Sequence, residues 1–325
     1  MKRRSFVTGA GAALLVPRLL EAQPEVRSYR VGVVSAGSPR SAPHWIGFEQ
    51  RLRELGYVPG RNVVVDFRNA DGHPDRMPGL MRDLVGAKVD VLVAPGPEAA
   101  LRAALAATRT IPIVVVAVDY DPVARGHVES LARPGTNATG VFLRQVELTN
   151  KRVGLVKDLR PSARRVTVFS DVFGRDQLAE VDTVARSIGL EVHHVEFREP
   201  PYDLTGPAQE AANRRAEAVL CLASPVFFRQ SADVARALLS HRLAGISPFR
   251  ELTEAGVLIS YGASLPGMFR RAAEYVDRLL RGANPADLPL EQPTQFELVV
   301  NVTTARIVGV TLSAALRLRA DSVVE

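Results

Sequence analysis

The sequence contains one cysteine among its 325 residues, so a framework of disulfide bonds is excluded. Cys221 lies in the apolar run AVLCLA, where a small buried hydrophobic side chain is the expected role. No histidine signature of a cysteine nucleophile accompanies it, and a catalytic thiol is therefore not indicated.

Long hydrophobic runs and basic stripes are also missing. After the first 22 residues the apolar runs are short and interrupted by charge, so none reaches the roughly 20 residues that a membrane-spanning helix needs. The net charge is +6, but lysine occurs only at positions 2, 88, 151 and 157, and the arginines are scattered among acids. Since nucleic-acid binders usually carry a basic patch with interleaved aromatic residues, no nucleic-acid partner is expected.

The sequence also lacks the common catalytic motifs. It has no G-x-S-x-G, H-E-x-x-H or Walker pattern. Its six histidines do not have the spacing of metal ligands, and His193 and His194 are neighbours on an expected strand, where they face opposite sides. We therefore predict a protein that is not an enzyme and that uses neither a cofactor nor a metal.

The first 22 residues have the architecture of an export signal. Gly9 and Gly11 lack the third glycine and the preceding strand of a dinucleotide-binding loop. Instead, a basic start with Arg3-Arg4 precedes a short uncharged stretch, and Ala22 offers a cleavage point. The arginine pair resembles a twin-arginine signal, which predicts a periplasmic location. An uncleaved membrane anchor stays open as the alternative.

Strand-like runs that are apolar at nearly every position alternate with helical patterns in both halves of the chain. In the first half, strands are expected at 29–35, 62–67, 89–94 and 111–118, and helices at 42–57, 75–86 and 98–107. After Pro161 the order begins again, with strands at 165–170, 190–197 and 218–223 and helices at 175–188, 205–215 and 226–241. Strands apolar on both faces, alternating with helices, predict an α/β protein with two Rossmann-like lobes and parallel sheets.

Two such lobes side by side would share a cleft at the carboxyl ends of their strands, where open α/β sheets bind ligands. Helices expected to begin at Pro97 and Pro225 would point backbone N–H groups at an anion. The alternative for the second helix is that Ser224 only caps it. Asp119 and Asp171 follow buried strands and could hold a ligand ammonium group or pair with nearby arginines.

Aromatic residues accompany these polar positions. Phe173, Phe249 and Tyr261 follow or end second-lobe strands and could wall an apolar ligand, although each could equally belong to the core. Trp45 opens the first helix, and we expect it to serve in packing rather than as a platform for a ligand.

Several longer motifs resemble the ABC-transporter substrate-binding protein family that includes tryptophan/tyrosine-type binding proteins. They are the RRSF signal, GFEQRLRELGYVPGRNVVVDFRNADGHPDRMPGL, DPVARGHVESLARPGTNATGV, FRELTEAGVLISYGAS and ANPADLPLEQPTQFELVVN. The resemblance covers nearly the whole chain and implies the type I periplasmic binding fold, with crossovers near residues 143, 262 and 284. It implies an N-terminal lobe of 29–143 plus 263–283 and a C-terminal lobe of 144–262 plus 284–325.

The resemblance also implies a set of ligand contacts. The sequence departs from the family pattern at two expected contact regions, with Ser-Asp-Val-Phe-Gly in place of an Asn-Pro-rich turn and Glu98 in place of a small residue. Because of these departures the resemblance alone does not identify the ligand. The implied contacts are Ser35, Gly37, Gly96, Pro97, Glu98, Asp119, Asp171, Phe173, Ser224, Phe249 and Tyr261.

The function expected from these features is capture of a small molecule between two closing lobes and its delivery to an ABC permease in the inner membrane. An amino acid or a related carboxylate fits helix N-termini, aspartates and aromatic residues, and we expect a monomer. Alternatives are a periplasmic sensor that signals to a membrane receptor, an enzyme on the same fold, and the effector domain of a transcription regulator.

Overall fold

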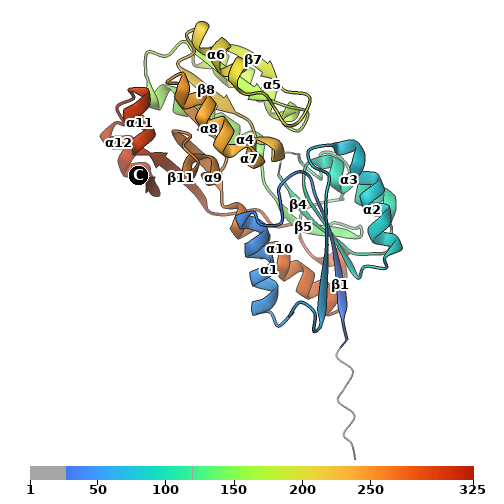
Figure 1. Cartoon of the computed structure of the whole chain (residues 1–325). Coiled ribbons are helices and arrows are strands. Elements are labelled where there is room, and N and C mark those ends of the chain that lie inside the picture. The colour runs from blue at the N-terminus through green and yellow to red at the C-terminus, as the bar shows by residue number, and fades with distance from the viewer. Residues whose placement is uncertain (1–26, 119) are drawn as a thin grey trace, which may run out of the picture.

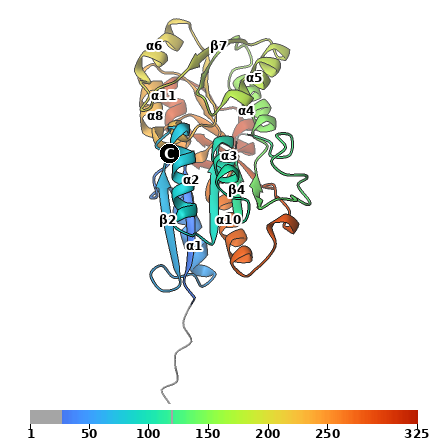
Figure 2. The ribbon, with the colours of Figure 1, turned by 90° about the vertical axis from the view of Figure 1, so that its right-hand side faces the viewer.

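The computed structural model describes residues 27–118 and 120–325 of the chain. The predicted signal segment 1–22 and the predicted contact Asp119 lie outside these residues. Two lobes are stacked end to end, with the N-terminal lobe at the lower right of Figure 1 and the other at the upper left. Figure 2 shows the same stacking from a second side.

The first lobe is built on a five-stranded sheet with the order β2-β1-β3-β4-β5, in which every pair of neighbours is parallel. One face carries α2 and α3, which contact each other, and the other face carries α1 together with the distant helix α10. The strands are β1 (Tyr29–Ser35), β2 (Val63–Asn69), β3 (Val91–Gly96), β4 (Ile113–Ala117) and β5 (Ala138–Phe142). The helices are α1 (Pro43–Glu54), α2 (Met77–Gly86), α3 (Glu98–Ala107) and α10 (Leu265–Leu280), with a 3-10 turn at Pro74–Arg76.

The second lobe is built on a seven-stranded sheet with the order β12-β11-β10-β9-β8-β6-β7. Its strands are β6 (Arg165–Ser170), β7 (Glu191–Glu196), β8 (Ala218–Cys221), β9 (Gly245–Ser247), β10 (Ile259–Ala263), β11 (Phe296–Asn301) and β12 (Ser322–Val324). Its helices are α4 (Gln145–Leu159), α5 (Arg175–Ser187), α6 (Thr205–Asn213), α7 (Pro225–Arg229), α8 (Ser231–Ser240), α9 (Arg250–Glu254), α11 (Val302–Val308) and α12 (Ala314–Arg319), and a 3-10 turn spans Pro285–Asp287.

This arrangement confirms the predicted α/β class with two lobes and parallel sheets, with one exception. β11 runs antiparallel to β10. The chain leaves the second lobe after β10, forms α10 in the first lobe, and returns through residues 281–295 before β11. Since β10 leads out of the lobe and β11 leads back in as its neighbour, the two strands run in opposite directions.

The segment expected to be one helix at 226–241 is two helices, so this prediction is wrong in detail. The helical path breaks at Gln230, whose backbone lies at φ −95° and ψ 25°. The Gln230 side chain accepts a hydrogen bond from Tyr202 N (2.8 Å) and donates one to Tyr202 O (3.1 Å). Two bonds to one backbone segment hold the break and fix α7 beside the loop that precedes α6.

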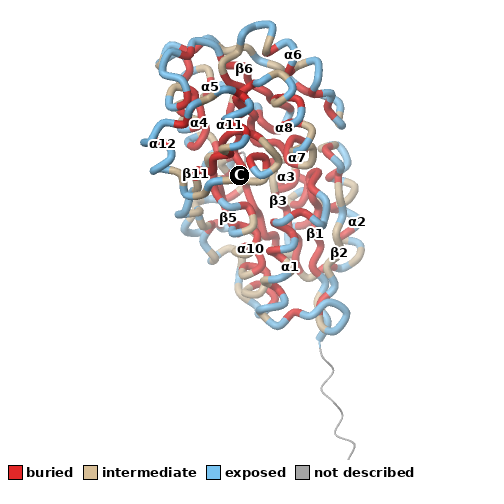
Figure 3. The backbone as a smooth tube through the Cα atoms, turned by 60° about the vertical axis from the view of Figure 1, so that its left-hand side comes forward, coloured by how far each residue is buried: buried red, intermediate tan, exposed pale blue. Residues whose placement is uncertain are grey.

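The central strands of both sheets are buried, as the red segments in the middle of Figure 3 show, whereas the edge strands β2, β7 and β12 are more exposed. One buried cluster joins residues of both lobes, including Trp45 and Phe269 of the first and Phe227 and Phe249 of the second. Among the described residues no helix is long and apolar enough to cross a membrane, and no group of three or more metal-ligating side chains gathers. The candidate site is therefore sought where this apolar cluster joins the two lobes.

Candidate ligand-binding cleft

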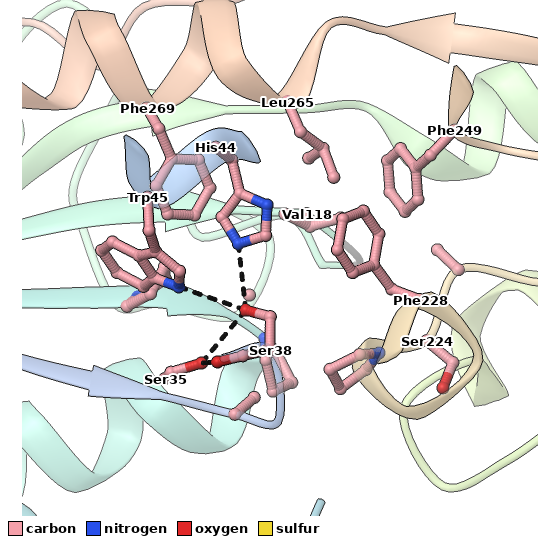
Figure 4. Close-up of a pocket in the computed structure, with 16 residues that line it drawn as sticks. Ser35, Ser38, His44, Trp45, Val118, Ser224, Phe228, Phe249, Leu265 and Phe269 are labelled. Atoms are coloured by element: carbon pink, nitrogen blue, oxygen red, sulfur yellow. Dashed lines mark hydrogen bonds between the residues drawn. The ribbon is translucent and has the colours of Figure 1, made fainter. Parts of the chain in front are cut away.

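A pocket lies between the two lobes, at the carboxyl ends of β1, β3, β4 and β8 (Figure 4). It holds about 560 Å³ of space free of protein atoms, which includes open solvent, and this size is within the range of small-molecule sites. The described lining residues are Ser35, Ala36, Ser38, His44, Trp45, Pro95, Gly96, Pro97, Val118, Ala223, Ser224, Pro225, Phe228, Phe249, Leu265 and Phe269. Most of these side chains are apolar or aromatic.

Aromatic rings from both lobes form the walls of the pocket. On the first-lobe side, the rings of Trp45 and Phe269 meet edge to face, with centroids 4.7 Å apart. On the second-lobe side, Phe228 and Phe249 also meet edge to face at 6.3 Å. His44 lies between the two groups, 4.5 Å from Phe269 and 5.1 Å from Phe228 between ring centroids. Such rings suit a flat apolar ligand because they offer large contact areas with few rotatable bonds.

The polar groups at the first-lobe end of the pocket bond mainly to one another. Ser38 Oγ lies 2.9 Å from His44 Nε2 and accepts from Trp45 Nε1 at 3.2 Å. Ser35 Oγ donates to the carbonyl oxygen of Ser38 at 2.8 Å and lies 3.1 Å from its Oγ. This network orients the Trp45 and His44 rings that face the pocket, as the dashed lines in Figure 4 show.

His44 is the one ionisable side chain among the described lining residues, and burial keeps it neutral. Only 4% of the residue is exposed. Burial among aromatic rings lowers the pKa of His44 to about 3, because the imidazolium ion would lose its hydration there. The described part of the pocket wall therefore carries no charge at neutral pH.

Five of the predicted contacts line the pocket: Ser35, Gly96, Pro97, Ser224 and Phe249. Gly37 lies beside them at the contact between the lobes, where a Cβ built on it would be 3.5 Å from Pro225 Cβ. The other described predicted positions, Glu98, Asp171, Phe173 and Tyr261, are not among the lining residues.

Asp171 has other partners than a ligand in this structure. Its Oδ2 accepts from Tyr202 Oη at 2.9 Å and from Ser224 Oγ, and its Oδ1 accepts from Phe173 N at 2.9 Å. Burial raises the pKa of Asp171, whereas these hydrogen bonds oppose the rise. The carboxyl group thus holds the loop after β6 and the start of α7 in place behind the pocket wall.

The two helix starts differ from each other and from the prediction. Pro225 is the first residue of α7 as predicted, but Ser224 Oγ caps the backbone N–H groups of Val226 and Phe227 at 3.0 and 3.1 Å. Ser224 therefore caps α7, and it also lines the pocket. We expected Pro97 to be the first helical residue, but it is the extended residue before α3, with φ −73° and ψ 157°. Gly96, which precedes it with φ +88°, turns the chain at the strand end, and the helix begins one residue later.

Phe173 and Tyr261 are held by neighbours in the second lobe. Phe173 is 6% exposed and belongs to the buried cluster. Tyr261 Oη accepts from Lys151 Nζ at 3.1 Å, and its ring stacks on Phe296 with centroids 6.4 Å apart. The burial of Phe173 matches the core alternative that the sequence left open, whereas Tyr261 is only partly buried and its hydroxyl meets the exposed Lys151.

Glu98 takes part in a charged contact that spans the cleft. Its carboxylate lies 2.8 Å from His127 Nε2 and 3.7 Å from Arg125 Nε. Arg125, in the loop between β4 and β5, also bonds to Asp176 at the start of α5 in the other lobe. Arg229 of α7 and Asp71 form a second, longer ion pair between the lobes at 3.8 Å. The lobes are therefore in contact on both sides of the pocket.

Replacing Arg125 with Ala should weaken ligand binding only about twofold to fivefold at low salt, because half-exposed ion pairs contribute about 0–1 kcal/mol. The difference should vanish in roughly 0.5 M salt, where the screening length falls to a few ångströms. Titration calorimetry at both salt concentrations measures this. Arg236→Ala, which removes an exposed ion pair within α8, is the matched control. A loss of affinity that persists at high salt would mean that Arg125 contributes to binding by more than a solvent-screened ion pair.

Ser38, His44, Phe228, Leu265 and Phe269 line the pocket but are absent from the predicted contacts. A signal existed for Phe228, since it lies four residues after the predicted contact Ser224, which is the spacing of about one helical turn. Leu265 and Phe269 belong to α10, which follows the first-lobe strands in the sequence only after β6 to β10 of the second lobe. No local pattern places this helix against β4 and β5.

A pocket between two α/β lobes, walled by aromatic rings from both, defines a small-molecule binding protein of the type I periplasmic binding fold. The family model described as ABC transporter substrate binding protein matches residues 38–324, and the chain belongs to this family.

Individual relatives agree with this assignment. A tyrosine-binding protein of Clostridioides difficile strain R20291 is 26% identical over 263 residues, which are 80% of this chain and 74% of the relative. A conserved domain protein from Vibrio cholerae O1 biovar El Tor has a TM-score of 0.82 at 24% identity, covering 91% of this chain and 100% of the other. The ABC domain from Streptococcus pneumonia in complex with L-Trp has a TM-score of 0.79 at 22% identity, with 91% and 100% covered. The last two likenesses show the fold.

Proposed function

We propose that this protein captures an aromatic amino acid between its lobes and delivers it to the permease of an ABC importer. The observation that carries the proposal is the set of four aromatic side chains, two from each lobe, around an otherwise uncharged pocket wall. Flat apolar groups gain most from such walls, because each ring buries a large area on contact. The tyrosine-binding relative and the L-Trp complex of a structural neighbour support the same ligand class.

The described wall is poorly suited to a sugar. A sugar needs many hydrogen-bonding side chains around its ring, whereas the hydroxyls of Ser35, Ser38 and Ser224 already bond to protein groups. For the ammonium group of an amino acid, Asp119 stays our proposed partner, since it follows Val118 of the pocket wall in the sequence. The carboxylate end is proposed to lie near Gly96 and Pro97.

A thermal-shift screen of residues 23–325 tests this ligand class. Aromatic amino acids at about 100 times their Kd should stabilise the protein by about 2.7 kcal/mol, because they bind only the folded state. Aliphatic amino acids, benzoate and neutral sugars serve as the comparison set. A shift from a sugar without any shift from an aromatic amino acid would contradict the proposal.

Binding of an aromatic ligand should also change the emission of Trp45, the only tryptophan of the chain. The Trp45 ring lines the pocket and is 2% exposed, so a ligand ring against it replaces water or empty space at its face. The result expected is a saturable change in emission intensity or wavelength with the same Kd as calorimetry gives. An unchanged spectrum at saturation would show that the ligand binds away from Trp45.

We further propose that the two lobes move as bodies made of 29–143 plus 263–283 and 144–262 plus 284–325. The sheet memberships and the packing of α10 on β4 and β5 support these bounds. Export by residues 1–22 with cleavage near Ala22, a periplasmic location, a monomeric state and the absence of catalysis complete the proposal. A binding protein for an importer needs no chemical step, since closing the lobes excludes water and retains the ligand.

A further inference from the structure

Among the described residues that line the pocket, one buried polar side-chain atom has no hydrogen-bond partner. His44 Nδ1 makes no hydrogen bond in the structure, although the residue is 4% exposed. In Figure 4 this nitrogen lies on the side of the ring that faces Leu265 and Phe228, away from Ser38. Because buried polar atoms in folded proteins are nearly always paired, an atom left unpaired at the wall of a ligand pocket indicates a contact that the ligand completes.

The protons of the neighbouring serines decide whether Nδ1 donates or accepts. The Ser35 hydroxyl donates to the Ser38 carbonyl at 2.8 Å, so its oxygen can only accept from Ser38 Oγ at 3.1 Å. The indole N–H of Trp45 can only donate, and it donates to Ser38 Oγ.

Every contact in this network has a donated hydrogen only if the Ser38 hydroxyl donates to Ser35 Oγ. Ser38 Oγ must then accept from His44 Nε2 at 2.9 Å, so the single proton of the neutral imidazole is on Nε2. In the other tautomer the contact between the two serine hydroxyls has no proton. The satisfied network therefore leaves Nδ1 as a hydrogen-bond acceptor.

The surroundings of Nδ1 select the kind of donor that it can receive. Phe228, Phe269 and Leu265 surround this part of the pocket, and no described lining side chain there carries a charge. An ammonium group would lose its hydration in such surroundings without a counter-ion, which is costly. A neutral O–H or N–H on an aromatic ring loses far less and brings an apolar body that fits the same walls.

We propose that His44 is a specificity-determining residue that accepts a hydrogen bond from a ring O–H or ring N–H of the ligand. The inference rests on the proposed function and narrows it to aromatic amino acids that carry a donor on the ring, such as a phenol or an indole. A plain phenyl ring fits the walls but leaves Nδ1 buried and unpaired. Sites built around such a hydrogen bond reject the analogue that lacks it.

The test compares L-tyrosine, L-tryptophan and L-phenylalanine by calorimetric titration of the unchanged protein. At least one ligand with a ring donor should bind about 10- to 100-fold more tightly than L-phenylalanine, the range expected when a buried acceptor is left unsatisfied. Equal affinities for all three would overturn the inference, because they would mean that Nδ1 meets no ring donor, or that it meets the ammonium group that all three share.

His44→Phe then tests the residue itself, since it keeps a ring in the aromatic wall and removes the acceptor. The preference over L-phenylalanine should fall to about threefold or less, as expected when no acceptor is left unpaired. His193→Phe, a matched change on β7 of the second lobe, should keep it. A preference that survives in His44→Phe would overturn the inference and leave the proposed function standing. If none of the three amino acids binds the unchanged protein, both fail.

Discussion

Gly72→Ala should weaken ligand binding about 5- to 150-fold while leaving each lobe folded. Gly72 is in the first lobe with φ +85°, and a Cβ built on it would lie 2.8 Å from Val226 Cγ2 and 3.3 Å from Pro200 Cγ, both in the second lobe. Val226 is fully buried and has no room to move aside. Overpacking of this kind costs about 1–3 kcal/mol, and here the cost falls on the contact between the lobes rather than within either lobe. Calorimetry with the preferred ligand measures the loss.

Gly56→Ala separates the clash between lobes from backbone strain. Gly56 has a similar backbone, with φ +95°, but a Cβ there would meet nothing within 4 Å. Both variants should lose about 1–2 kcal/mol of stability, since a side chain is disfavoured in this conformation. Only Gly72→Ala should lose affinity. If the two variants bound ligand equally well, the contact between Gly72 and Val226 would have no part in closure.

Lowering the pH from 6.5 to about 4.5 should destabilise the protein, with its lobes in contact as described, by about 2–3 kcal/mol more than it destabilises His44→Phe. In the unfolded chain His44 takes up a proton near its ordinary pKa of 6.5, whereas burial lowers the pKa in the folded protein to about 3. Between these values the unfolded state binds one more proton, so the free energy of unfolding falls by about 1.4 kcal/mol for each unit of pH decrease. The contribution of the neutral imidazole is fully present above pH 6.5.

Urea unfolding at half-unit steps of pH measures this difference. Carboxylates elsewhere also lower the stability of the protein in acid, but they are shared by the wild type and His44→Phe and cancel in the subtraction. The difference in the free energy of unfolding between the wild type and His44→Phe should change with pH between pH 6.5 and 3 and be constant above pH 6.5. Parallel curves throughout would mean that His44 is protonated without cost in the folded protein, contrary to its burial among aromatic rings.

Local sequence patterns predicted individual elements well. The strands 29–35 and 165–170 have the bounds that their apolar spacing indicated. Ser35, Gly96, Pro97, Ser224 and Phe249 lie at the pocket because strand ends of parallel sheets meet on one side, which is a rule of topology rather than of individual residues.

The remaining features depend on contacts between distant segments. The Asp171 carboxylate accepts a hydrogen bond from Tyr202, which lies 31 residues later in the sequence, and no local pattern near either residue predicts this contact. Phe269 reaches the pocket because α10 returns to the first lobe, and the role of His44 depends on its burial by Phe228 and Phe269 from two other parts of the chain. The resemblance to the family indicated the crossovers, but not which side chains they bring together.

A crystal structure of the complex with the aromatic amino acid that gives the largest thermal shift would show whether an aromatic ligand binds between the lobes. We expect the ligand ring between Trp45 and Phe269 on one side and Phe228 and Phe249 on the other, with a ring donor at hydrogen-bond distance from His44 Nδ1. A ligand that contacts only one lobe, or whose ring lies outside this aromatic pocket, would contradict this expectation.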